Sequence, residues 1–439
     1  MLVRDPVHGD IYFTKKEQKI IDCPAIQRLR GVKQLGTTYL VYPGATHTRF
    51  NHSLGTAFIA KQIIKGLEKK GFIIDEPTKE LISIAGLVHD CTHVPYGHTF
   101  EDERRIFDRH DKKDYFQDIL NKGLLGDLLE GWGIKKELLN MLVHTDPMIK
   151  TTKEPWKGQI INDTICADLL DYLRRDCYYT GITKDYDDRI FDYFIIQDDK
   201  LVLDFVKNMM ERSDARSEIL HLLRLRYFLT ERVYYHHAKL ASGAMISKAL
   251  ELASKENLIT RDDLYHFNDW SLLHFLKNEP IKRDKTDPIR KLVEGVEERR
   301  LLKRAFVLSS SSLSSRGSRE KFIKKFNPPT SEREQVEQMI IDRLRKETKD
   351  KSINASDVII HCLSSSALKE AEVLIKNING ELTRLNQRPH PSADIKALED
   401  AYEDLWRMYV FASSKHTKKV SKICEETFGR ENEYKPAKK

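Results

Sequence analysis

The sequence lacks the features that mark secreted and membrane-embedded chains. It has six cysteines in 439 residues, and none of them forms a Cys-x-x-Cys pair, so a disulfide scaffold is not expected. No apolar run approaches the roughly 18 residues that a transmembrane helix needs. The N-terminus also lacks the apolar segment of a signal peptide. We therefore expect a soluble, cytoplasmic protein in a reducing environment, with no membrane partner.

Charge, by contrast, is plentiful. Charged residues make up 32% of the chain, and the net charge is +7. A positive excess favours anionic partners such as nucleotides, and it supports nucleic acid only weakly. Hydrophobic residues make up 40%, which is enough for a sizeable core, and 439 residues are too many for one ordinary domain.

The first part of the chain has the apolar spacing of helices. Apolar residues that recur at helical intervals predict helices over His52–Leu67, Lys79–His89, Ile160–Tyr178 and Ser217–Leu252. The serine-rich stretch Ser309–Ser318 is expected to be a loop because of its composition.

The last part of the chain has the sequence pattern of short strands as well as helices. Strands are predicted over Asp357–Leu363 and Tyr409–Ala412, and a hairpin over Val373–Leu385 around the turn signal Asn379-Gly380. A final helix is expected to end at Phe428. We predict a helical core over residues 1–265, a helical and loop connector over 266–330, and a small α+β region over 331–439.

Histidine is concentrated in one short segment. Three of the sixteen histidines and two carboxylates fall within 13 residues, from the pair His89-Asp90 through His93 and His98 to Glu101. Neutral imidazole and carboxylate together form a natural ligand set for a divalent metal. The alternative is a polar loop whose histidines bond to nearby backbone groups.

Two further residues could complete such a ligand set. His52 begins the first predicted helix, although it could simply be a helix-start residue. Asp168 lies among apolar positions of the third helix, where burying a carboxylate is costly unless it is paired or coordinates a metal. The pairing alternative is a salt bridge to Arg174 or Arg175. With His89-Asp90, these residues suit Fe, Mn or Zn, which can activate water and polarise a phosphoryl oxygen.

A phosphate substrate also needs cations and hydrogen-bond donors. Arg49 lies three residues before the first of these histidines, and Arg226 and Tyr234 lie eight apart on one predicted helix face. Tyr172 and Asp176 follow the predicted ligand in the third helix at intervals of one turn. For each of them, a surface charge or a core aromatic is the alternative.

These residues resemble a known pattern. The order His…His-Asp…Asp is the signature of the HD-domain phosphohydrolases, and longer strings resemble one branch, the dNTP triphosphohydrolases. That branch includes the vertebrate SAM-and-HD-domain enzyme and bacterial relatives; no SAM domain is recognised here. The strings are Asp5-Pro-Val-His-Gly9, Asp22-Cys-Pro-Ala-Ile-Gln-Arg-Leu-Arg30, Lys33-Gln-Leu-Gly36, Tyr42-Pro-Gly-Ala-Thr-His-Thr-Arg-Phe-Asn-His-Ser-Leu-Gly55, His89-Asp-x-x-His-x-Pro-x-x-His98 and Asp168-x-x-Asp-Tyr-x-x-Arg-Asp176.

The resemblance implies a mainly α fold, with an all-helical HD core and a smaller C-terminal α+β region. It implies an enzyme that hydrolyses a deoxynucleoside triphosphate to a deoxynucleoside and triphosphate, with Mg accompanying the nucleotide. The matching positions imply metal ligands at His52, His89, Asp90 and Asp168, catalytic groups at His93, Glu101 and His110, deoxyribose contacts at Gln34, Leu35, Asp176 and Tyr234, and phosphate contacts at Arg49, His98, Tyr172 and Arg226.

The resemblance also implies a regulatory site and a homo-oligomer, either dimer or tetramer. Asp22, Gln27 and Arg30 match a site that recognises the guanine of an activating GTP or dGTP. The alternative is that Asp22 caps a helix that begins at Pro24. One departure concerns the phosphates, because Leu169 stands where some members carry a lysine.

Two other functions remain open at this stage. The first is a different HD nucleotide phosphohydrolase, either a nucleotidase or a (p)ppGpp-type hydrolase. The second is a nucleic-acid-binding or regulatory protein with a vestigial HD site, which the positive charge and Leu169 would favour. The products of the reaction distinguish these functions.

Overall fold

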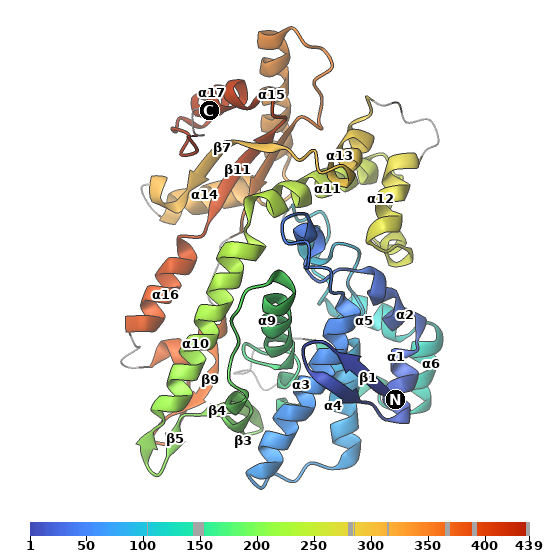
Figure 1. Cartoon of the computed structure of the whole chain (residues 1–439), viewed down its shortest axis with the longest axis vertical. Helices are drawn as coiled ribbons and strands as arrows, with labels where there is room; N and C mark the ends of the chain where they lie inside the picture. The colour runs from blue at the N-terminus through green and yellow to red at the C-terminus, as the bar shows by residue number, and fades with distance from the viewer. Residues whose placement is uncertain are drawn as a thin grey trace.

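The computed structural model describes residues 1–102, 104–143, 153–279, 284, 286–313, 316–364, 369–388 and 393–435. Figure 1 shows an elongated, mainly helical molecule, with the N-terminal helices at one end and a small sheet flanked by helices at the other. The predicted fold class, a helical core with a smaller C-terminal α+β region, is confirmed. Among the described residues, no helix has both the length and the apolar content that crossing a membrane requires.

The first two predicted helices are confirmed, and each begins about one turn earlier than expected. Helix α3 spans Arg49–Lys69 and α4 spans Glu76–Val88. A capping box in which Thr48 and Asn51 bond to each other's backbone fixes the start of α3. The two helices pack side by side, and this places the residues that follow α4 beside the first turn of α3.

The third predicted helix was too long at its start. A short helix α8, Trp156–Gln159, comes first, then turns, and α9 spans Ala167–Thr180. The backbone at Cys166 is extended, with φ −149° and ψ 179°, so the helix cannot continue through it. Helix α9 ends at Gly181, which adopts the left-handed conformation with φ 73°.

The prediction of one helix over Ser217–Leu252 was wrong. Helix α10, Ser213–Leu229, runs into a π-helical turn, η5 (Thr230–Tyr234), and α11, His237–Lys255, then leaves in another direction (Figure 1). His236 is extended, and its side chain accepts a hydrogen bond from the backbone of Ala238 at the start of α11. No proline or glycine marks the break, so the apolar spacing gives no sign of it.

The C-terminal sheet is antiparallel in the order β7-β11-β8, over Lys303–Ser309, Arg407–Ala412 and Val358–Cys362. The two strands and the final helix predicted here are confirmed. The helices around the sheet are α14, α15 and α17, over Arg316–Phe326, Ser331–Thr348 and Thr417–Phe428. The serine-rich segment Ser309–Ser318 is not one loop, because its first residue belongs to β7 and its last three belong to α14. Residues 314–315 of this predicted loop lie outside the described residues.

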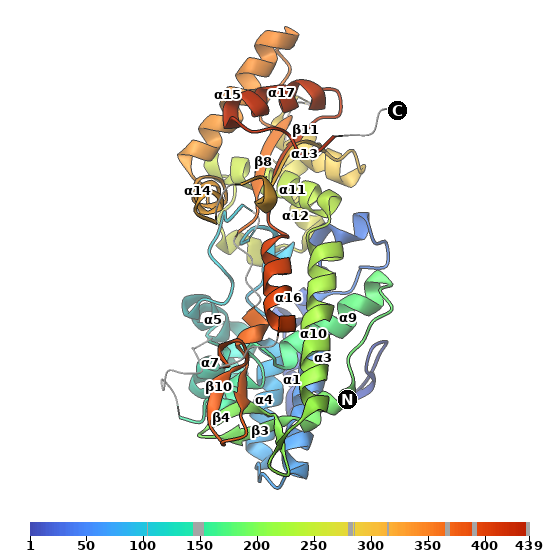
Figure 2. The same ribbon diagram turned by 90° about the vertical axis from the view of Figure 1, so that its left-hand side faces the viewer.

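A second sheet joins distant parts of the chain in the order β10-β9-β4-β3. The predicted hairpin is confirmed as β9, Leu374–Lys376, and β10, Leu382–Arg384, with Gly380 in the left-handed region at the turn. Strand β9 pairs in parallel with β4, Lys200–Asp204, which itself pairs with β3, Phe194–Gln197. The C-terminal region thus returns to the N-terminal half (Figure 2).

Most of the remaining helices and strands pack around two large hydrophobic cores. They are β1 (Leu2–Asp5), β2 (Gly9–Tyr12), α1 (Lys15–Ile21), α2 (Pro24–Gln27), α5 (Lys113–Leu120), α6 (Gly123–Gly131), α7 (Lys135–Leu142), α12 (Asp269–Asn278), α13 (Pro288–Glu297) and α16 (Ala393–Glu403).

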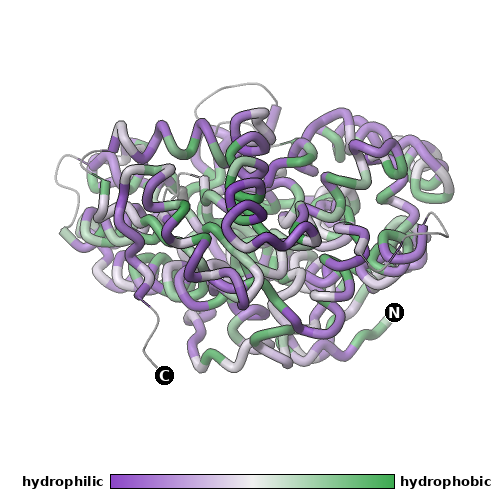
Figure 3. The backbone as a smooth tube through the Cα atoms, turned by 90° about the horizontal axis from the view of Figure 1, so that it is seen from above, coloured by the Kyte–Doolittle hydropathy of each residue, from purple (hydrophilic) through white to green (hydrophobic). Residues whose placement is uncertain are grey.

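One core contains α3, α4, α9 and α10, and the other contains α11 to α15, the C-terminal sheet and α17. Six buried residues that come late in the chain also belong to the first core: Ala371, Val373, Ile375, Leu385, Ile395 and Tyr402. Hydrophobic and hydrophilic residues alternate along the helices, as expected where one face is buried (Figure 3). The division into residues 1–265, 266–330 and 331–439 stays a prediction.

A buried group of charges fixes the end of the histidine-rich segment to the second core. Arg104, fully buried, donates to Glu251 at 2.6 Å, to Glu337 at 2.9 Å and to the carbonyl of Ile360 in β8 at 2.8 Å. Lys248 also donates to Glu337, at 2.8 Å. Because Arg104 follows the histidine-rich segment directly, these contacts tie that segment to α11, α15 and the C-terminal sheet.

Replacing Arg104 with alanine should destabilise the protein strongly. Two buried carboxylates would lose their main partner, and breaking a buried ion pair by removing one member costs about 3–5 kcal/mol. Urea unfolding of Arg104→Ala beside Arg109→Ala tests this, because Arg109 forms exposed ion pairs and should change stability by no more than about 1 kcal/mol. Equal unfolding midpoints for the two variants would show that the buried contacts of Arg104 do not stabilise the fold.

Candidate metal centre and active site

Four predicted ligands converge from three segments. His52 lies in the first turn of α3, His89-Asp90 follows α4 directly, and Asp168 lies in the first turn of α9. His52 Nε2 is 2.8 Å from Asp168 Oδ1, 3.2 Å from His89 Nε2 and 4.0 Å from Asp90 Oδ2. The side chain of Asp168 is 39% exposed, so this group opens toward solvent on one side.

Both imidazoles are oriented by their second nitrogen. His52 Nδ1 lies 2.7 Å from Asp171 Oδ2, and His89 Nδ1 lies 2.8 Å from the carbonyl of Gly86. A carbonyl or an ionised carboxylate only accepts, so Nδ1 carries the proton in each ring and Nε2 faces the cluster. This is the usual arrangement of metal-binding histidines. Two nitrogens and two carboxylates from four separate residues therefore fit a divalent metal.

The electrostatics of the cluster favour a cation. Burial opposes charge on all these groups, but hydrogen bonds from His52 and His89 hold the pKa of Asp168 below its ordinary value. Arg49 and the nearby histidines likewise keep the pKa of Asp90 well below its usual range. Burial alone would lower the pKa of His52, yet bonds to two aspartates raise it to about 10. The carboxylates thus hold a positive charge where a metal would lie.

The carboxylate that orients His52 was given no role in the sequence analysis. Asp171 is fully buried and also contacts His8 Nε2 at 2.5 Å and Arg175 at 2.9 Å, and Arg175 pairs with Asp5 at 2.8 Å. A Cβ at Gly55 would lie 1.9 Å from Asp171 Oδ1, so only glycine fits beside it. These residues fall within the quoted motif strings, but nothing local in the sequence shows that they touch.

Arg174 and Arg175 do not pair with Asp168. Arg174 binds Asp185 and Asp188 instead, and Arg175 binds the two aspartates already named. The salt-bridge alternative for Asp168 is therefore wrong.

Arg49 connects the ligand group to its surroundings. It is 1% exposed, and its Nη1 donates to Asp90 Oδ2 at 2.7 Å. Its Nε and Nη2 have no hydrogen-bond partner among the described residues. A Cβ at Gly97 would lie 2.5 Å from Nη2, so glycine is needed where the loop passes. The remaining donors of Arg49 can therefore serve an anion.

A second histidine group lies beside the first. His93 contacts Asp90 Oδ1 at 3.2 Å, and its ring stacks on that of His110 with centroids 3.5 Å apart. Glu101 Oε2 accepts from His110 Nδ1 at 2.8 Å and lies 3.4 Å from His98 Nδ1. One nitrogen each of His93, His98 and His110 lie close enough together to hold an ion as well, so geometry alone leaves this group either a second cation site or a proton-transfer group. Burial and the charge of Arg49 lower the pKa of His93 well below its ordinary value.

A third group could face a sugar. Tyr234 donates to Asp176 Oδ2 at 2.6 Å, and His47 Nε2 lies 2.8 Å from Asp176 Oδ1. Gln34 donates its backbone N–H to the carbonyl of His47, and its side-chain oxygen is buried without a partner among the described residues. Leu35 packs against the first core. His47 was quoted in a motif string without a role.

The aromatic and basic residues of α9 and α10 also meet. The Arg226 guanidinium lies 5.0 Å from the ring centre of Tyr172 and 5.5 Å from that of Tyr234. Tyr172 in turn lies 6.4 Å from His52, between centroids. Arg226 Nε is 3.3 Å from Glu370 Oε1, a partner from far along the chain. Leu169 is 4% exposed and belongs to the core.

Asp269, in α12, holds two loops of the site. Its buried carboxylate accepts from the backbone N–H of Lys33 at 2.9 Å and of Tyr96 at 2.8 Å. Tyr96 has φ 62°, a conformation that costs a non-glycine residue energy. Asp269 therefore fixes the segment before Gln34 and the loop between the histidines. The sequence analysis missed it because no local pattern links α12 to these loops.

The three predicted regulatory residues lie near α1 and α2. Gln27 donates to the carbonyl of Ile21 at 2.8 Å and accepts from Arg30 Nε at 2.8 Å. Asp22 is exposed and ends α1. The N-cap of α2 is Cys23, with no side-chain bond, so the idea that Asp22 caps this helix is wrong.

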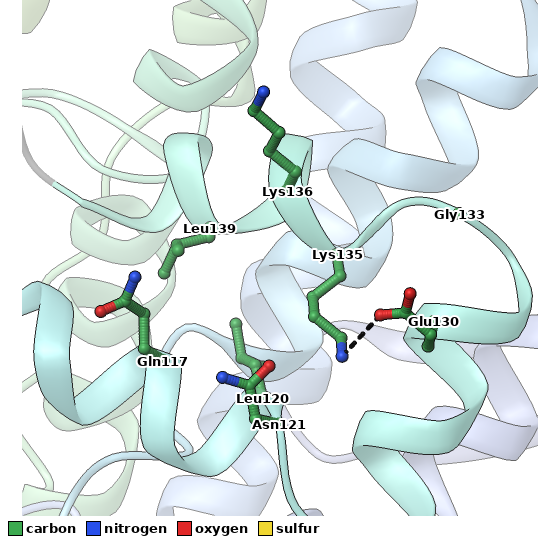
Figure 4. A pocket seen from close by; sticks show the side chains of 8 residues that line it. All are labelled: Gln117, Leu120, Asn121, Glu130, Gly133, Lys135, Lys136 and Leu139. Atoms are coloured by element: carbon green, nitrogen blue, oxygen red, sulfur yellow. Dashed lines mark ion pairs between the residues drawn. The ribbon is translucent and has the colours of Figure 1, made fainter.

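Two cavities lie away from these groups. One, of about 320 Å³, lies between α5, α6 and α7, with the ion pair of Lys135 and Glu130 beside it (Figure 4). The other, of about 630 Å³, lies beside α7 and α8. None of the predicted site residues lines either cavity, so neither bears on the metal cluster.

The chain matches two family profiles. One, described as the HD domain, matches residues 49–176 and therefore contains all four residues of the metal cluster. The other, described as the HD associated region, matches residues 188–439, which is more than half of the chain. HD domains bind a divalent metal, in agreement with the buried histidine and aspartate cluster.

Curated relatives match part of the chain. The deoxynucleoside triphosphate triphosphohydrolase SAMHD1 of Mus musculus is 29% identical over 281 residues, which cover 56% of this chain and 43% of the relative. An uncharacterized protein of Methanocaldococcus jannaschii is 31% identical over 283 residues, or 63% of this chain and 55% of that one. The chain thus matches about half the length of these relatives.

Solved structures share the whole fold. A phosphohydrolase from Bacteroides thetaiotaomicron superposes with a TM-score of 0.69 over 94% of this chain and all of that one, at 21% identity. A hypothetical protein from Aquifex aeolicus gives a TM-score of 0.66 over 96% of this chain and 98% of its own, at 22% identity.

Replacing Asp171 with asparagine should weaken metal binding. The amide keeps the shape but removes the charge that orients and polarises His52, and loss of such an outer partner typically reduces metal affinity about 10- to 100-fold. Competition with a chelator, followed by metal analysis, measures this. Asp185→Asn is the matched control, because Asp185 binds Arg174 at an exposed position. Unchanged affinity in Asp171→Asn would show that this carboxylate does not tune the site.

Proposed function

The chain belongs to the HD-domain family that carries the HD-associated region, and on that premise we propose that it is a dNTP triphosphohydrolase. Its reaction would release a deoxynucleoside and intact triphosphate. The observation that supports a metal-dependent hydrolase most strongly is the convergence of His52, His89, Asp90 and Asp168. The SAMHD1 relatives support the choice of substrate.

The metal ligands would be the four converging residues, with Fe, Mn or Zn as the ion. A metal bound there supplies Lewis acidity and lowers the pKa of a water molecule. The chain's own contribution is to fix the substrate. Arg49, two of whose buried donors have no partner within the described part of the chain, would bind a phosphate oxygen next to Asp90. Fixed cations stabilise charge that develops on phosphoryl oxygens.

The second histidine group would move the proton of the reaction. His93, His110 and Glu101 lie beside Asp90 in hydrogen-bond contact or ring contact with one another. A protonated histidine that bonds to a carboxylate through one ring nitrogen can donate a proton from the other nitrogen to the oxygen of the leaving group. His98, which is 45% exposed at its side chain, would reach the phosphates from the solvent side.

The group around Asp176 would select a deoxyribose. Tyr234 and His47 both bond to Asp176, which holds the tyrosine ring in place. Leu35 and Gln34 come from the loop that Asp269 fixes through Lys33. A fixed ring and an apolar side chain would leave a 2′-hydroxyl without room or a partner. Tyr172 and Arg226 would bind the distal phosphates, with Mg accompanying the nucleotide.

Regulation and assembly belong to the same proposal. The bonded pair Gln27 and Arg30, with exposed Asp22 nearby, offers donors and an acceptor that suit the edge of a guanine from GTP or dGTP. An activator of this kind would stabilise a homodimer or homotetramer if it bound the assembled form more tightly. The resulting function would be control of a nucleotide pool, not nucleic-acid binding.

One observation favours a second candidate, an HD nucleotidase that acts on fewer phosphates. Leu169 supplies no charge where some members of the family carry a lysine. Fewer free cations suit a less charged substrate such as a nucleoside monophosphate.

Product analysis separates these functions. Metal-replete protein is incubated with each dNTP and each ribonucleotide, with and without GTP, and the products are resolved by chromatography. We expect a deoxynucleoside and triphosphate, faster turnover of dGTP than of GTP, and stimulation of other dNTPs by GTP. Asp168→Ala should abolish turnover while Asp185→Ala does not. Release of monophosphate and pyrophosphate, or turnover of monophosphates alone, would contradict the proposal.

A further inference from the structure

Arg226 is enclosed by groups from two distant parts of the chain. Tyr172 of the HD domain and Tyr234 of the turn after α10 lie beside its guanidinium. Glu370 lies 3.3 Å from its Nε, and the side chains of the pair are 28% and 11% exposed. Burial opposes the charge of Arg226, but these neighbours raise its pKa well above the ordinary value. The guanidinium of Arg226 therefore stays charged, and it already forms an ion pair with the carboxylate of Glu370.

Glu370 is held at this position by the fold. It lies in the short helix η8, Lys369–Glu372, directly before buried Ala371 and four residues before the start of β9. Strand β9 pairs with β4, and Leu385 donates its backbone N–H to the carbonyl of Val373, so the chain that follows Glu370 is fixed in place. A late segment of the HD-associated region therefore delivers one carboxylate to an arginine of α10, which lies near the start of the same region.

We propose that Glu370 is a specificity-determining residue that competes with substrate phosphates for Arg226. This inference rests on the proposed function, in which Arg226 binds phosphate. A carboxylate and a phosphate oxygen bind a guanidinium through the same kind of charge-assisted bond, and one Nε donor cannot serve both fully. A substrate anion that binds the Nε edge of Arg226 must therefore displace Glu370, and only a highly charged group recovers the lost ion pair.

The competition would set the number of phosphates that the enzyme accepts. A monophosphate gains little from Arg226 after displacing Glu370, whereas a triphosphate brings more charge to the same guanidinium. Neutralising Glu370 should then strengthen binding of every phosphate chain. The relative gain should be largest for short chains, because they compete least well.

The experiment measures binding of inorganic tripolyphosphate and of inorganic phosphate by calorimetry, without turnover. Glu370→Gln keeps the shape and removes the charge. We expect it to bind tripolyphosphate about fivefold more tightly or better, as release of an ion pair of this kind allows. Glu372→Gln is the matched control, since Glu372 lies in the same short helix but pairs with Arg384. It should bind as the wild type does.

A second pair of variants assigns the effect to Arg226. In an Arg226→Ala background, Glu370→Gln should change binding by less than about twofold, because no guanidinium remains to be released. Thermal melts of all variants check the fold. Weaker binding in Glu370→Gln would overturn the proposal and make Glu370 a positioning residue for Arg226. Equal binding in wild type and Glu370→Gln, or none in either, would overturn it too.

Failure of the proposed function gives a different result. If no dNTP is turned over but Glu370→Gln still binds tripolyphosphate more tightly, the reaction is wrong and the competition stands. If dNTPs are hydrolysed to triphosphate but Glu370→Gln leaves their KM unchanged, the reaction stands and the competition fails.

Discussion

The metal cluster depends on one buried carboxylate. Asp171 bonds to His52 in α3, to His8 in the N-terminal hairpin and to Arg175 in its own helix, and Arg175 is neutralised again by Asp5. Charges this deeply buried are stable only when every partner is present. Helices α3 and α9 are therefore held at one spacing, at which Asp168 meets His52. The absence of a side chain at Gly55 is part of the same fit.

The two halves of the chain build the site together. The HD domain supplies the cluster and the histidine-rich segment, whose end Arg104 fixes to α11, α15 and the C-terminal sheet. Asp269, in the associated region, holds the loops before Gln34 and around Tyr96. The segment that carries Glu370 returns to the first core and reaches Arg226. An HD domain of this type would thus lack parts of its substrate wall without the associated region.

Much of the fold and the ligand set could be predicted because both leave local signals. Helical spacing revealed α3 and α4, and the turn at Asn379-Gly380 revealed its hairpin. The ligands were recognisable because a carboxylate at an apolar helix position and a dense histidine segment are chemically unusual. Assignment of each role still came from resemblance to a family, and these roles stay proposals.

What could not be predicted has no local signal. The π-helical break after α10 contains neither proline nor glycine, so spacing alone predicts a continuous helix. In the sequence, three important carboxylates look like ordinary acidic residues: Asp171, Asp269 and Glu370. Asp171 and Asp269 act through contacts with residues 119 and 236 positions away, and Glu370 is positioned by the pairing of β9 with the distant strand β4. Only the folded chain shows which carboxylates are buried and what they hold.

The position of the bound metal tests this account most directly. Crystals of the metal-replete protein, measured at the absorption edge of the metal found in it, give an anomalous peak at the ion. We predict one strong peak about 2.0–2.2 Å from His52 Nε2, His89 Nε2 and one oxygen each of Asp90 and Asp168. A peak at His93, His98 and His110 instead, with none at the four residues, would contradict the assignment of the metal centre and of the proton-transfer group.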